Sequence, residues 1–370
     1  MSNAIKVGIA GAGSIAFGTA ALLCENGHDP MLWSPSGEGT KELAGGAQLK
    51  AVGTLEVTCA PRIAEDAATL ARDNDVLIIA LPGYGHKTVL DALAPHIRNG
   101  QQVIISSHMS LGAVYLAGLL EARGLAVPIT AWGTTAITGR RQSGAEVRVN
   151  TVRKLIDLCT VPEEMSGEAL ELCKSLFGDR FQPRDGLLAI SLSNLNPQNH
   201  MGIALGNMTR MERGETWSQG QNVTPNVGRL LEELDKERLA IAEALGLQVR
   251  TIFEHFHLSF HVPVASISEM NQEMHEQGNG GTGPATADSR YVTEDVPYGL
   301  ALTVALGDLT GRPAELHRAG IRIFSAMYGR DFIAENELLN ALDLDSTTLD
   351  ALRQAARTGL LQERVAEAMP

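Results

Sequence analysis

Several features are scarce in this chain of 370 residues, and each scarcity excludes a class of protein. Four cysteines are too few and too scattered for a disulfide framework or a CxxC zinc site, so we expect buried thiols in a cytoplasmic protein. No apolar run reaches the ~18–20 residues that a membrane span requires. The N-terminus also lacks the basic region and cleavage site of a signal peptide. We therefore expect no membrane partner.

Positive charge is scarce as well. The chain has 30 lysines and arginines against 43 aspartates and glutamates, which gives a formal net charge of −13. A protein that binds nucleic acid needs a basic surface, so no nucleic-acid partner is expected. Lysine is the scarcer cation, with seven lysines against twenty-three arginines, and none follows Lys236. The second half of the chain therefore offers almost no candidate for a catalytic lysine.

The first half of the chain alternates strand-like and helix-like segments. The length exceeds what one compact core usually accommodates, so two domains are expected. Strand–helix alternation predicts an α/β fold, here an N-terminal Rossmann-like domain with a doubly wound parallel sheet over residues 1–183. A further hairpin around Gly139 and Gly144 should extend this sheet. The expected strands are 4–10, 29–34, 55–60, 75–82 and 101–107, with helices between them.

From about residue 184 the expected segments are long and helical, which predicts an all-helical C-terminal domain over residues 184–370. The stretch 276–289 is rich in glycine and has no periodicity, so we expect a loop that serves as a lid or a binding element. Helices expected over 227–245 and 346–368 would suit a homodimer or would equally cover the core, and the sequence leaves both open. The remaining expected helices are 186–193, 197–213, 298–308, 312–328 and 335–341.

The motif GAGSIA at residues 11–16 follows a strand and opens a helix, which is the context of a dinucleotide-binding turn. Gly11 would permit the tight turn, and Gly13 would let the backbone approach a pyrophosphate. Ala16 would still allow close helix–strand packing. The pyrophosphate would lie at the helix N-terminus beside the N–H groups of Ser14 and Ile15. A turn that serves packing alone is the alternative.

The residue at the end of the second strand distinguishes NAD from NADP. A carboxylate at this position would bind the ribose hydroxyl of NAD and repel a 2′-phosphate. The sequence has Ser34 there, followed by Ser36, Thr40 and Lys41, and this set favours NADP(H) while leaving NAD(H) possible. Glu38 weakens the pattern, and no arginine lies nearby in the sequence. After the fourth strand, Leu81, Pro82 and Gly83 are expected beside the cofactor.

The segment SLSNLNPQNHMG, residues 191–202, places a histidine at the start of an otherwise apolar helix. Asn196 is a good N-cap and Pro197 suits the first helical position, so His200 falls in the first turn. The positive helix end disfavours a protonated imidazole there, and the histidine therefore needs a carboxylate partner. A purely structural histidine is the alternative.

The segment RYVTED, late in the chain, supplies candidate partners. Both Glu294 and Asp295 could orient and charge the histidine, and we prefer Asp295. Arg290 could hold a substrate carboxylate with its planar guanidinium, or could form a structural ion pair with Asp295. A dehydrogenase acting on a carbonyl or imine needs such a set, because a proton must be delivered as hydride arrives.

Together, the N-terminal GxGxxA turn, the NPxxH segment and the RYxTED segment resemble the octopine/nopaline (opine) dehydrogenase family from the turn to about residue 330. The resemblance implies a Rossmann-like domain followed by a helical domain. It also implies NAD(P)H-dependent reductive condensation of an α-keto acid with an amino acid or amine. His200 and Asp295 match the acid/base pair of the family, and Arg290 matches its arginine near a substrate carboxylate. The residues that choose the amino partner have no clear pattern here.

Two alternatives of other kinds stay open. One is an NADP-dependent reductase of a simple keto or hydroxy acid, as in the ketopantoate, glycerol-3-phosphate and β-hydroxyacid dehydrogenases. Those enzymes generally use a lysine of the helical domain, where this chain has only Lys236 in an acidic run. The other is a nucleotide-sensing protein without catalysis. The cluster His255, His257 and His261 lacks further ligands, so we expect no metal site.

Overall fold

The computed structural model describes residues 4–361. They form two compact units. Unit 1 comprises the described residues up to Ser191 together with those from Asp350 on, and unit 2 comprises Leu192–Leu349. The sequence predicted a single boundary at residues 183/184, whereas the contacts divide the chain eight residues later and return its C-terminal part to unit 1.

The last described helix, α16 (Leu349–Thr358), explains this return. Arg357 forms ion pairs with Glu163 and Asp185, both of which belong to unit 1. The helix expected over 346–368 is shorter than predicted, and its part beyond residue 361 lies outside the described residues.

The main sheet of unit 1 confirms the doubly wound fold. Its eight strands lie in the order β12-β11-β8-β7-β6-β1-β2-β5, and its neighbouring strands are parallel except for β8 and β11. Because β2 and β6 lie on opposite sides of β1, the order reverses there, and ligands of such sheets bind at the carboxyl ends near this point. The strands are β1 (Lys6–Ala10), β2 (Asp29–Trp33), β5 (Arg62–Ile63), β6 (Val76–Ile79), β7 (Gln102–Ile105), β8 (Ile129–Trp132), β11 (Ile156–Val161) and β12 (Phe181–Pro183).

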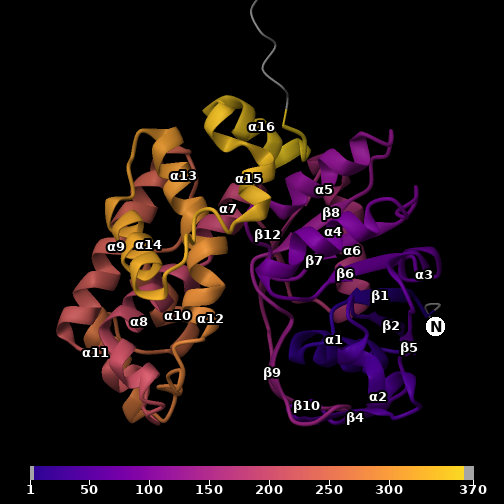
Figure 1. Ribbon diagram of the computed structural model, residues 1–370, viewed down its shortest axis with the longest axis horizontal. Helices are drawn as coiled ribbons and strands as arrows, with labels where there is room; N and C mark the ends of the chain where they lie inside the picture. Colours follow the sequence, from indigo (N-terminus) through magenta and orange to yellow (C-terminus); the bar gives the residue numbers. More distant parts are fainter. Residues whose placement is uncertain (1–3, 362–370) are drawn as a thin grey trace, which may run out of the picture. The chain divides into compact units, whose positions relative to one another are not determined.

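Helices cover the sheet in two groups (Figure 1). The helices α3 (Ala67–Arg72), α4 (His86–Leu93) and α5 (Gly112–Glu121) pack in succession, while α1 (Ser14–Glu25) packs against α6 (Ser166–Phe177). Right-handed crossovers that lead in opposite directions from β1 and β6 place α1 and α4 on opposite faces.

A second sheet packs on the other side of α1. It contains β4 (Val57–Cys59), β3 (Leu49–Gly53), β10 (Glu146–Val152) and β9 (Ile137–Arg141) in that order. The predicted hairpin is therefore present as β9–β10, but it does not extend the main sheet. The helix α1 is buried continuously from Ala16 to Leu23, because both sheets cover it. A β-carbon on Gly18 would lie 2.6 Å from Ile137 Cδ1, so glycine permits this close packing.

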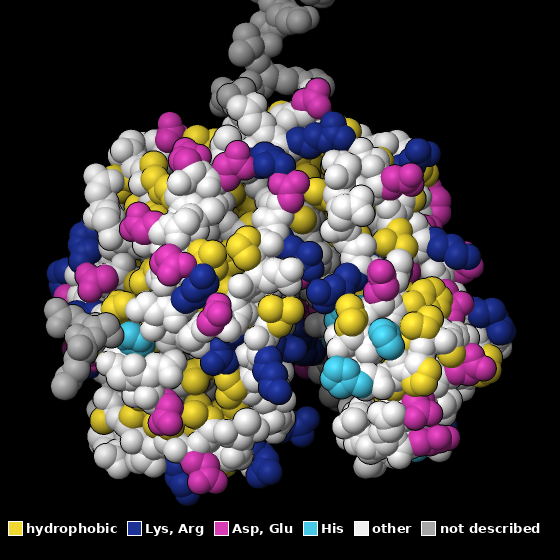
Figure 2. All heavy atoms as spheres, turned by 180° about the vertical axis from the view of Figure 1, so that it is seen from behind, with side chains coloured by type: hydrophobic (Ala, Val, Ile, Leu, Met, Phe, Trp, Pro, Cys, Tyr) yellow, Lys and Arg dark blue, Asp and Glu magenta, His cyan; other side chains and the backbone are white. Residues whose placement is uncertain are grey.

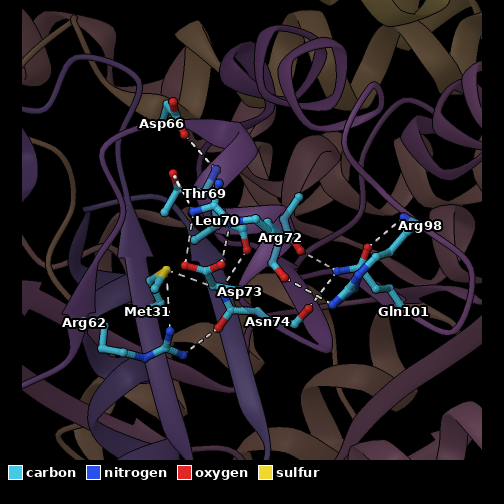
Figure 3. Close-up of polar contacts among 11 residues, drawn as sticks. Met31, Arg62, Asp66, Thr69, Leu70, Arg72, Asp73, Asn74, Arg98 and Gln101 are labelled. Atoms are coloured by element: carbon cyan, nitrogen blue, oxygen red, sulfur yellow. Dashed lines mark hydrogen bonds and ion pairs between the residues drawn. The ribbon is translucent and has the colours of Figure 1, made fainter.

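A polar network closes the amino ends of the main strands, opposite the edge expected to bind the cofactor (Figure 3). The fully buried Asn74 donates to Leu70 O at 2.7 Å and accepts from Arg62 Nη2 at 2.8 Å. Gln101 donates to the carbonyls of Ala71 and Asn74 at 2.6 and 2.7 Å. These side chains satisfy backbone groups that would otherwise be buried without partners.

Unit 2 is helical in the described part of the chain, apart from one isolated β-bridge between Ser218 and Thr282. The long helix α9 packs against α8, α11, α13 and α14, so its apolar face is used within the unit. The segment 278–289 is irregular, as predicted for the glycine-rich stretch. The helices are α8 (Asn196–Glu212), α9 (Pro225–Ala244), α10 (Ile252–Phe260), α11 (Ile267–Glu276), α12 (Arg290–Thr293), α13 (Ala301–Thr310), α14 (Glu315–Tyr328) and α15 (Glu337–Leu342), with a π-helical turn at Val296–Leu300.

A buried charged network joins α8, α9 and the start of α10. Asp235 accepts from Arg238 Nη2 at 2.7 Å, from Gln198 Nε2 at 2.9 Å and from the backbone of Ile252 at 2.8 Å. The side chains of Asp235 and Arg238 are each only 3% exposed. Gln198 lies two residues before His200, so this network also holds the turn of α8 that carries the histidine.

Among the described residues, none of the helices combines the length and the apolarity needed to cross a membrane. Figure 2 shows acidic and basic side chains interspersed on the visible face, with hydrophobic side chains in small groups. All four cysteines are free thiols: Cys159 and Cys173 are buried as predicted, whereas Cys24 and Cys59 are partly exposed where α1 meets β4.

Candidate active site

The glycine turn after β1 has the geometry that the motif predicts. Gly11 has φ +142°, its N–H donates to Trp33 O at 2.8 Å, and a β-carbon there would collide with the carbonyl of Ala80. Gly13 is different, because a β-carbon there would meet no atom within 4 Å. Glycine at position 11 is thus required by the fold, while glycine at position 13 keeps open the space in front of the helix.

The helix α1 begins directly behind this space. Gly13 is its N-cap and has no side chain to satisfy the first N–H groups, which belong to Ser14, Ile15 and Ala16. Ala16 is fully buried against the sheet, as expected for the third motif position. Unpaired N–H groups and the helix dipole favour an anion at this end. The residues present therefore fit the pyrophosphate of a dinucleotide.

The loop after β2 only partly matches its predicted role. The hydroxyls of Ser34 and Ser36 lie 3.5 Å apart at its exposed side, and the largely exposed Lys41 lies 3.6 Å from Glu38. Thr40 differs from the prediction, because its residue is buried and its hydroxyl donates to Gly37 O at 3.2 Å. This hydroxyl closes the loop instead of facing a ligand.

Sequence reasoning missed one arginine near this loop. Arg141 Nη1 donates to Ala12 O, and its Nη2 donates to Gly39 O, both at 3.0 Å. The guanidinium also lies 4.5 Å from the ring centre of Phe17. Arg141 thus joins the glycine turn to the loop that follows β2. No sequence signal places it there, because it reaches both segments from β9, about a hundred residues later.

The segment after β6 includes Leu81, Pro82 and Gly83, which lie at the carboxyl edge of the sheet. His86 Nε2 donates to Leu81 O at 3.0 Å and so fixes this segment. Burial lowers the pKa of His86 to about 4. Burial, with a smaller contribution from His86, lowers the pKa of His108 to about 3. Both histidines are therefore neutral near pH 7.

In unit 2 the structure brings His200 and Asp295 together. His200 Nδ1 lies 2.7 Å from Asp295 Oδ2, and the side chains are 14% and 1% exposed. A carboxylate at Nδ1 fixes the tautomer in which Nδ1 carries the proton shared with Asp295, and it leaves Nε2 for chemistry. Asp295 directly precedes the π-helical turn, a local widening of the helix that is frequent at functional sites.

The start of α8 differs slightly from the prediction. The helix begins at Asn196 with Leu195 as the N-cap, and the predicted cap Asn196 makes no capping hydrogen bond. Instead, Asn194 Oδ1 accepts from the backbone N–H of Asn196 at 3.1 Å. His200 is therefore the fifth residue of the helix and lies in its first turns.

Arg290 pairs with Glu294 rather than with Asp295. Its Nε lies 3.4 Å from Glu294 Oε2, and its side chain is 57% exposed. Desolvation disfavours the charge of Arg290, but the carboxylates of Glu294 and Asp295 outweigh this effect and raise its pKa. Glu294 thus pairs with Arg290, whereas Asp295 pairs with His200. The preference for Asp295 over Glu294 as the partner of the histidine requires this arrangement.

Tyr291 is a second residue that sequence reasoning missed. Its ring stacks on the imidazole of His200, with centroids 3.6 Å apart and planes 11° from parallel. Its hydroxyl donates to Gln219 Oε1. Tyr291 lies inside the RYxTED segment. Its stacking on His200 could not be predicted, because a contact between residues far apart in the chain leaves no spacing pattern in the sequence.

Two other candidate groups are engaged elsewhere. Lys236 is 69% exposed and pairs with Glu233 at 2.6 Å on the outside of α9. In the histidine cluster, His257 Nδ1 donates to Val262 O at 2.8 Å. The described residues contain no group of three or more histidine, cysteine or acidic side chains placed to hold a metal ion.

A doubly wound sheet with an open glycine turn, together with a helical unit that contains a buried histidine–carboxylate pair, defines a dinucleotide-dependent dehydrogenase. The comparisons with known proteins agree. Residues 6–108 match a model described as NADP oxidoreductase, coenzyme F420-dependent. Residues 183–328 match the model of the NAD/NADP octopine/nopaline dehydrogenase α-helical domain.

The chain is 29% identical over 356 residues to an opine dehydrogenase of Arthrobacter sp. (strain 1C), covering 94% of this chain and 97% of that protein. Two solved structures share its fold. An octopine dehydrogenase with NADH and L-arginine has a TM-score of 0.81 at 17% identity, covering 95% of this chain and 98% of that one. A yersinopine dehydrogenase with NADP⁺ bound has a TM-score of 0.69 at 17% identity, covering 92% and 99%.

The chain is therefore similar to the opine dehydrogenases over nearly its whole length. It is an NAD(P)-dependent oxidoreductase of the type that acts on CH–NH donors.

Proposed function

We propose that this chain condenses an α-keto acid with an amino acid or amine and reduces the resulting C=N bond, with NADPH preferred over NADH. The observation that carries the proposal is the hydrogen-bonded pair of His200 and Asp295, 2.7 Å apart. The solved octopine dehydrogenase structures contain L-arginine, agmatine or pyruvate, which supports an amino partner and a keto acid here.

In this reaction His200 moves protons at Nε2. The protonated imidazole gives a proton to the keto oxygen as the amine adds, takes a proton back from the amine nitrogen, and gives it to the hydroxyl that leaves as water. Asp295, hydrogen-bonded at Nδ1, stabilises the imidazolium and holds the ring in one orientation. When bound, a reduced nicotinamide cofactor would supply the hydride for this reduction.

Arg290 is proposed to bind the carboxylate of the keto acid. Its side chain is largely exposed and remains charged, as carboxylate recognition requires. Glu294 occupies Nε of Arg290, so a substrate would use the remaining N–H groups of the guanidinium.

The NADPH preference is proposed from the loop that follows β2. No carboxylate stands at the end of this strand, and the exposed side of the loop offers Ser34, Ser36 and Lys41. Arg141 adds a positive charge next to Gly39 in the same loop. A 2′-phosphate would meet hydroxyls and cations there instead of an acidic residue.

The experiment is a panel of keto acids tested with amino acids and amines, in which the absorbance of NADPH or NADH is followed. Cofactor oxidation should require an amine together with the keto acid. Replacing His200 by alanine should lower kcat by ~10²–10⁴, the usual range for a positioned acid. Lys236→Ala is the matched control and should retain full activity.

Oxidation of the cofactor by a keto acid alone, with the rate insensitive to added amines, would instead establish a simple keto-acid reductase. Tight dinucleotide binding without turnover over the whole panel would establish a nucleotide sensor. The position of Lys236 disfavours the simple keto-acid reductase, because this lysine is exposed and paired with Glu233.

A further inference from the structure

The imidazole of His200 is restrained on more than its Asp295 side. One face of the ring is covered by Tyr291, at 3.6 Å between centroids and 11° between planes. Asp295 Oδ2 lies 2.7 Å from Nδ1 of the ring. With one face and one nitrogen engaged, the ring can neither rotate about χ2 nor tilt without losing a contact, and the position of Nε2 is set.

Tyr291 is itself anchored. Ser289 Oγ accepts from the backbone N–H of Tyr291 at 3.3 Å, and the tyrosine hydroxyl donates to Gln219 Oε1. The hydroxyl is therefore directed toward Gln219. Burial, with the charge of Asp295 as a smaller cause, raises the pKa of Tyr291 to about 12, so the phenol keeps its proton at neutral pH.

Gln219 in turn belongs to a segment that is hydrogen-bonded to the glycine-rich loop. The backbone N–H of Gln219 donates to Gly281 O at 3.1 Å, and that of Gly220 donates to Gly280 O at 2.7 Å. Ser218 pairs with Thr282 in the isolated β-bridge. A continuous set of contacts therefore runs from the glycine-rich loop through Gln219 and Tyr291 to His200.

We propose that Tyr291 is a positioning residue, which holds the plane of His200 and which Gln219 links to the glycine-rich loop. The inference deepens the role proposed above for His200, and it rests on that role only for its effect on catalysis.

The first test compares Tyr291→Leu with Tyr291→Phe. Leucine keeps apolar cover over the imidazole but removes the π face, whereas phenylalanine keeps the stack and loses only the hydroxyl. The readout is the NMR signal of the His200 ring at one fixed pH, in protein labelled at histidine Cε1, with His200→Gln used to assign the signal among the ten histidines. It needs no turnover, so it remains informative if the proposed reaction is wrong.

Tyr291→Leu should move this signal downfield and broaden it, because the shielding by the stacked phenol ring is lost and the imidazole is freer to move. Tyr291→Phe should leave the signal nearly unchanged. In the active enzyme, Tyr291→Leu should lower kcat about tenfold while KM changes less than threefold. An unchanged His200 signal in Tyr291→Leu would overturn the inference.

Tyr328→Leu is the matched control, because it also removes a ring and a hydroxyl hydrogen bond, the one to Ala287 O at 2.7 Å. It should not change the His200 signal. A change that is equal in both leucine variants would show a general loosening of unit 2 and would count against the inference.

The link to the glycine-rich loop is tested by a double-mutant cycle. This cycle does not use Tyr291→Leu, so it remains informative if that variant fails to fold. Tyr291→Phe and Gln219→Leu each break the same hydrogen bond. Each should lower kcat two- to fivefold, and the double variant should match the single variants, because the second change has no bond left to remove. Additive effects would refute the link.

Discussion

The imidazole of His200 and the carboxylate of Asp295 are ninety-five positions apart in the chain and 2.7 Å apart in the structure. The carboxylate is 1% exposed. It is held against the imidazole by α8 on one side and by the backbone between α12 and the π-helical turn on the other. The hydrogen-bond partner of this buried carboxylate is the imidazole of His200, and the first prediction uses this contact.

Asp295→Asn should lower kcat by ~10²-fold or more, because the amide no longer stabilises the imidazolium and can also impose the wrong tautomer. Steady-state rates with NADPH would measure the loss, and fluorescence titration should give an unchanged cofactor Kd. Glu294→Gln is the control, since its partner is Arg290, and kcat should fall less than tenfold. Equal losses in the two variants would contradict the assignment of Asp295.

The two motif glycines should respond in opposite ways to a β-carbon. Gly13→Ala adds an atom where nothing lies within 4 Å, so the thermal midpoint should stay the same. The cofactor Kd should rise at least about tenfold, which is about 1.4 kcal/mol, because the methyl group fills the expected pyrophosphate space. Gly11→Ala should destabilise the fold instead, since φ is +142° and the carbonyl of Ala80 blocks the site. Tight cofactor binding by Gly13→Ala would show that the turn serves packing alone.

Cofactor choice should depend on residue 34. Ser34→Asp places a carboxylate at the end of β2, where it can accept from a ribose hydroxyl and repel a 2′-phosphate. The ratio of kcat/KM for NADPH to that for NADH should fall by about tenfold or more. Ser36→Ala is the control for the loss of a hydroxyl without added charge. A ratio that Ser34→Asp leaves unchanged would place the 2′-position of the ribose elsewhere.

The ion pair of Asp235 and Arg238 should be essential for the stability of unit 2. Asp235→Ala removes the acceptor of Arg238, Gln198 and the Ile252 backbone, and leaves a guanidinium buried without its counter-charge. The free energy of unfolding should fall by about 3–5 kcal/mol. Urea denaturation followed by circular dichroism measures this change. Glu233→Ala, which breaks an exposed pair on the same helix, should hardly move the transition.

The free energy of unfolding should decrease as the pH is lowered, because of His86 and His108. Burial lowers the pKa of these side chains in the folded state to about 4 and about 3, whereas in the unfolded chain they titrate near 6.5. Below pH 6.5 the unfolded state takes up protons that the folded state does not bind, so the free energy of unfolding falls toward pH 4. The slope is at most about 1.4 kcal/mol per pH unit for each histidine.

Urea unfolding at pH 7.5, 6.5 and 5.5 would show this slope. His86→Gln keeps a side-chain donor for Leu81 O but cannot be protonated, so its stability should depend less steeply on pH than that of the parent chain. Parallel slopes in the two proteins would rule out His86 as a source of the pH dependence.

The fold class follows from the amino-acid sequence alone, because the signals for it are local. The alternation of apolar strands and amphipathic helices predicts a doubly wound sheet, and the GxGxxA turn requires glycine at position 11 whatever surrounds it. The NPxxH and RYxTED segments were enough to select His200 and Asp295 as candidates, since their residue types suit the chemistry.

How distant segments meet, in contrast, depends on packing in three dimensions. The β9–β10 hairpin joins β3 in a second sheet, since α1 is apolar all round and must be covered on both sides. The C-terminal helix returns to unit 1 through Arg357, and Arg141 reaches the glycine turn from β9. Tyr291 covers His200 although no spacing rule links the two. Such contacts depend on side-chain packing between residues far apart in the chain, and the periodicity of either segment alone does not predict this packing.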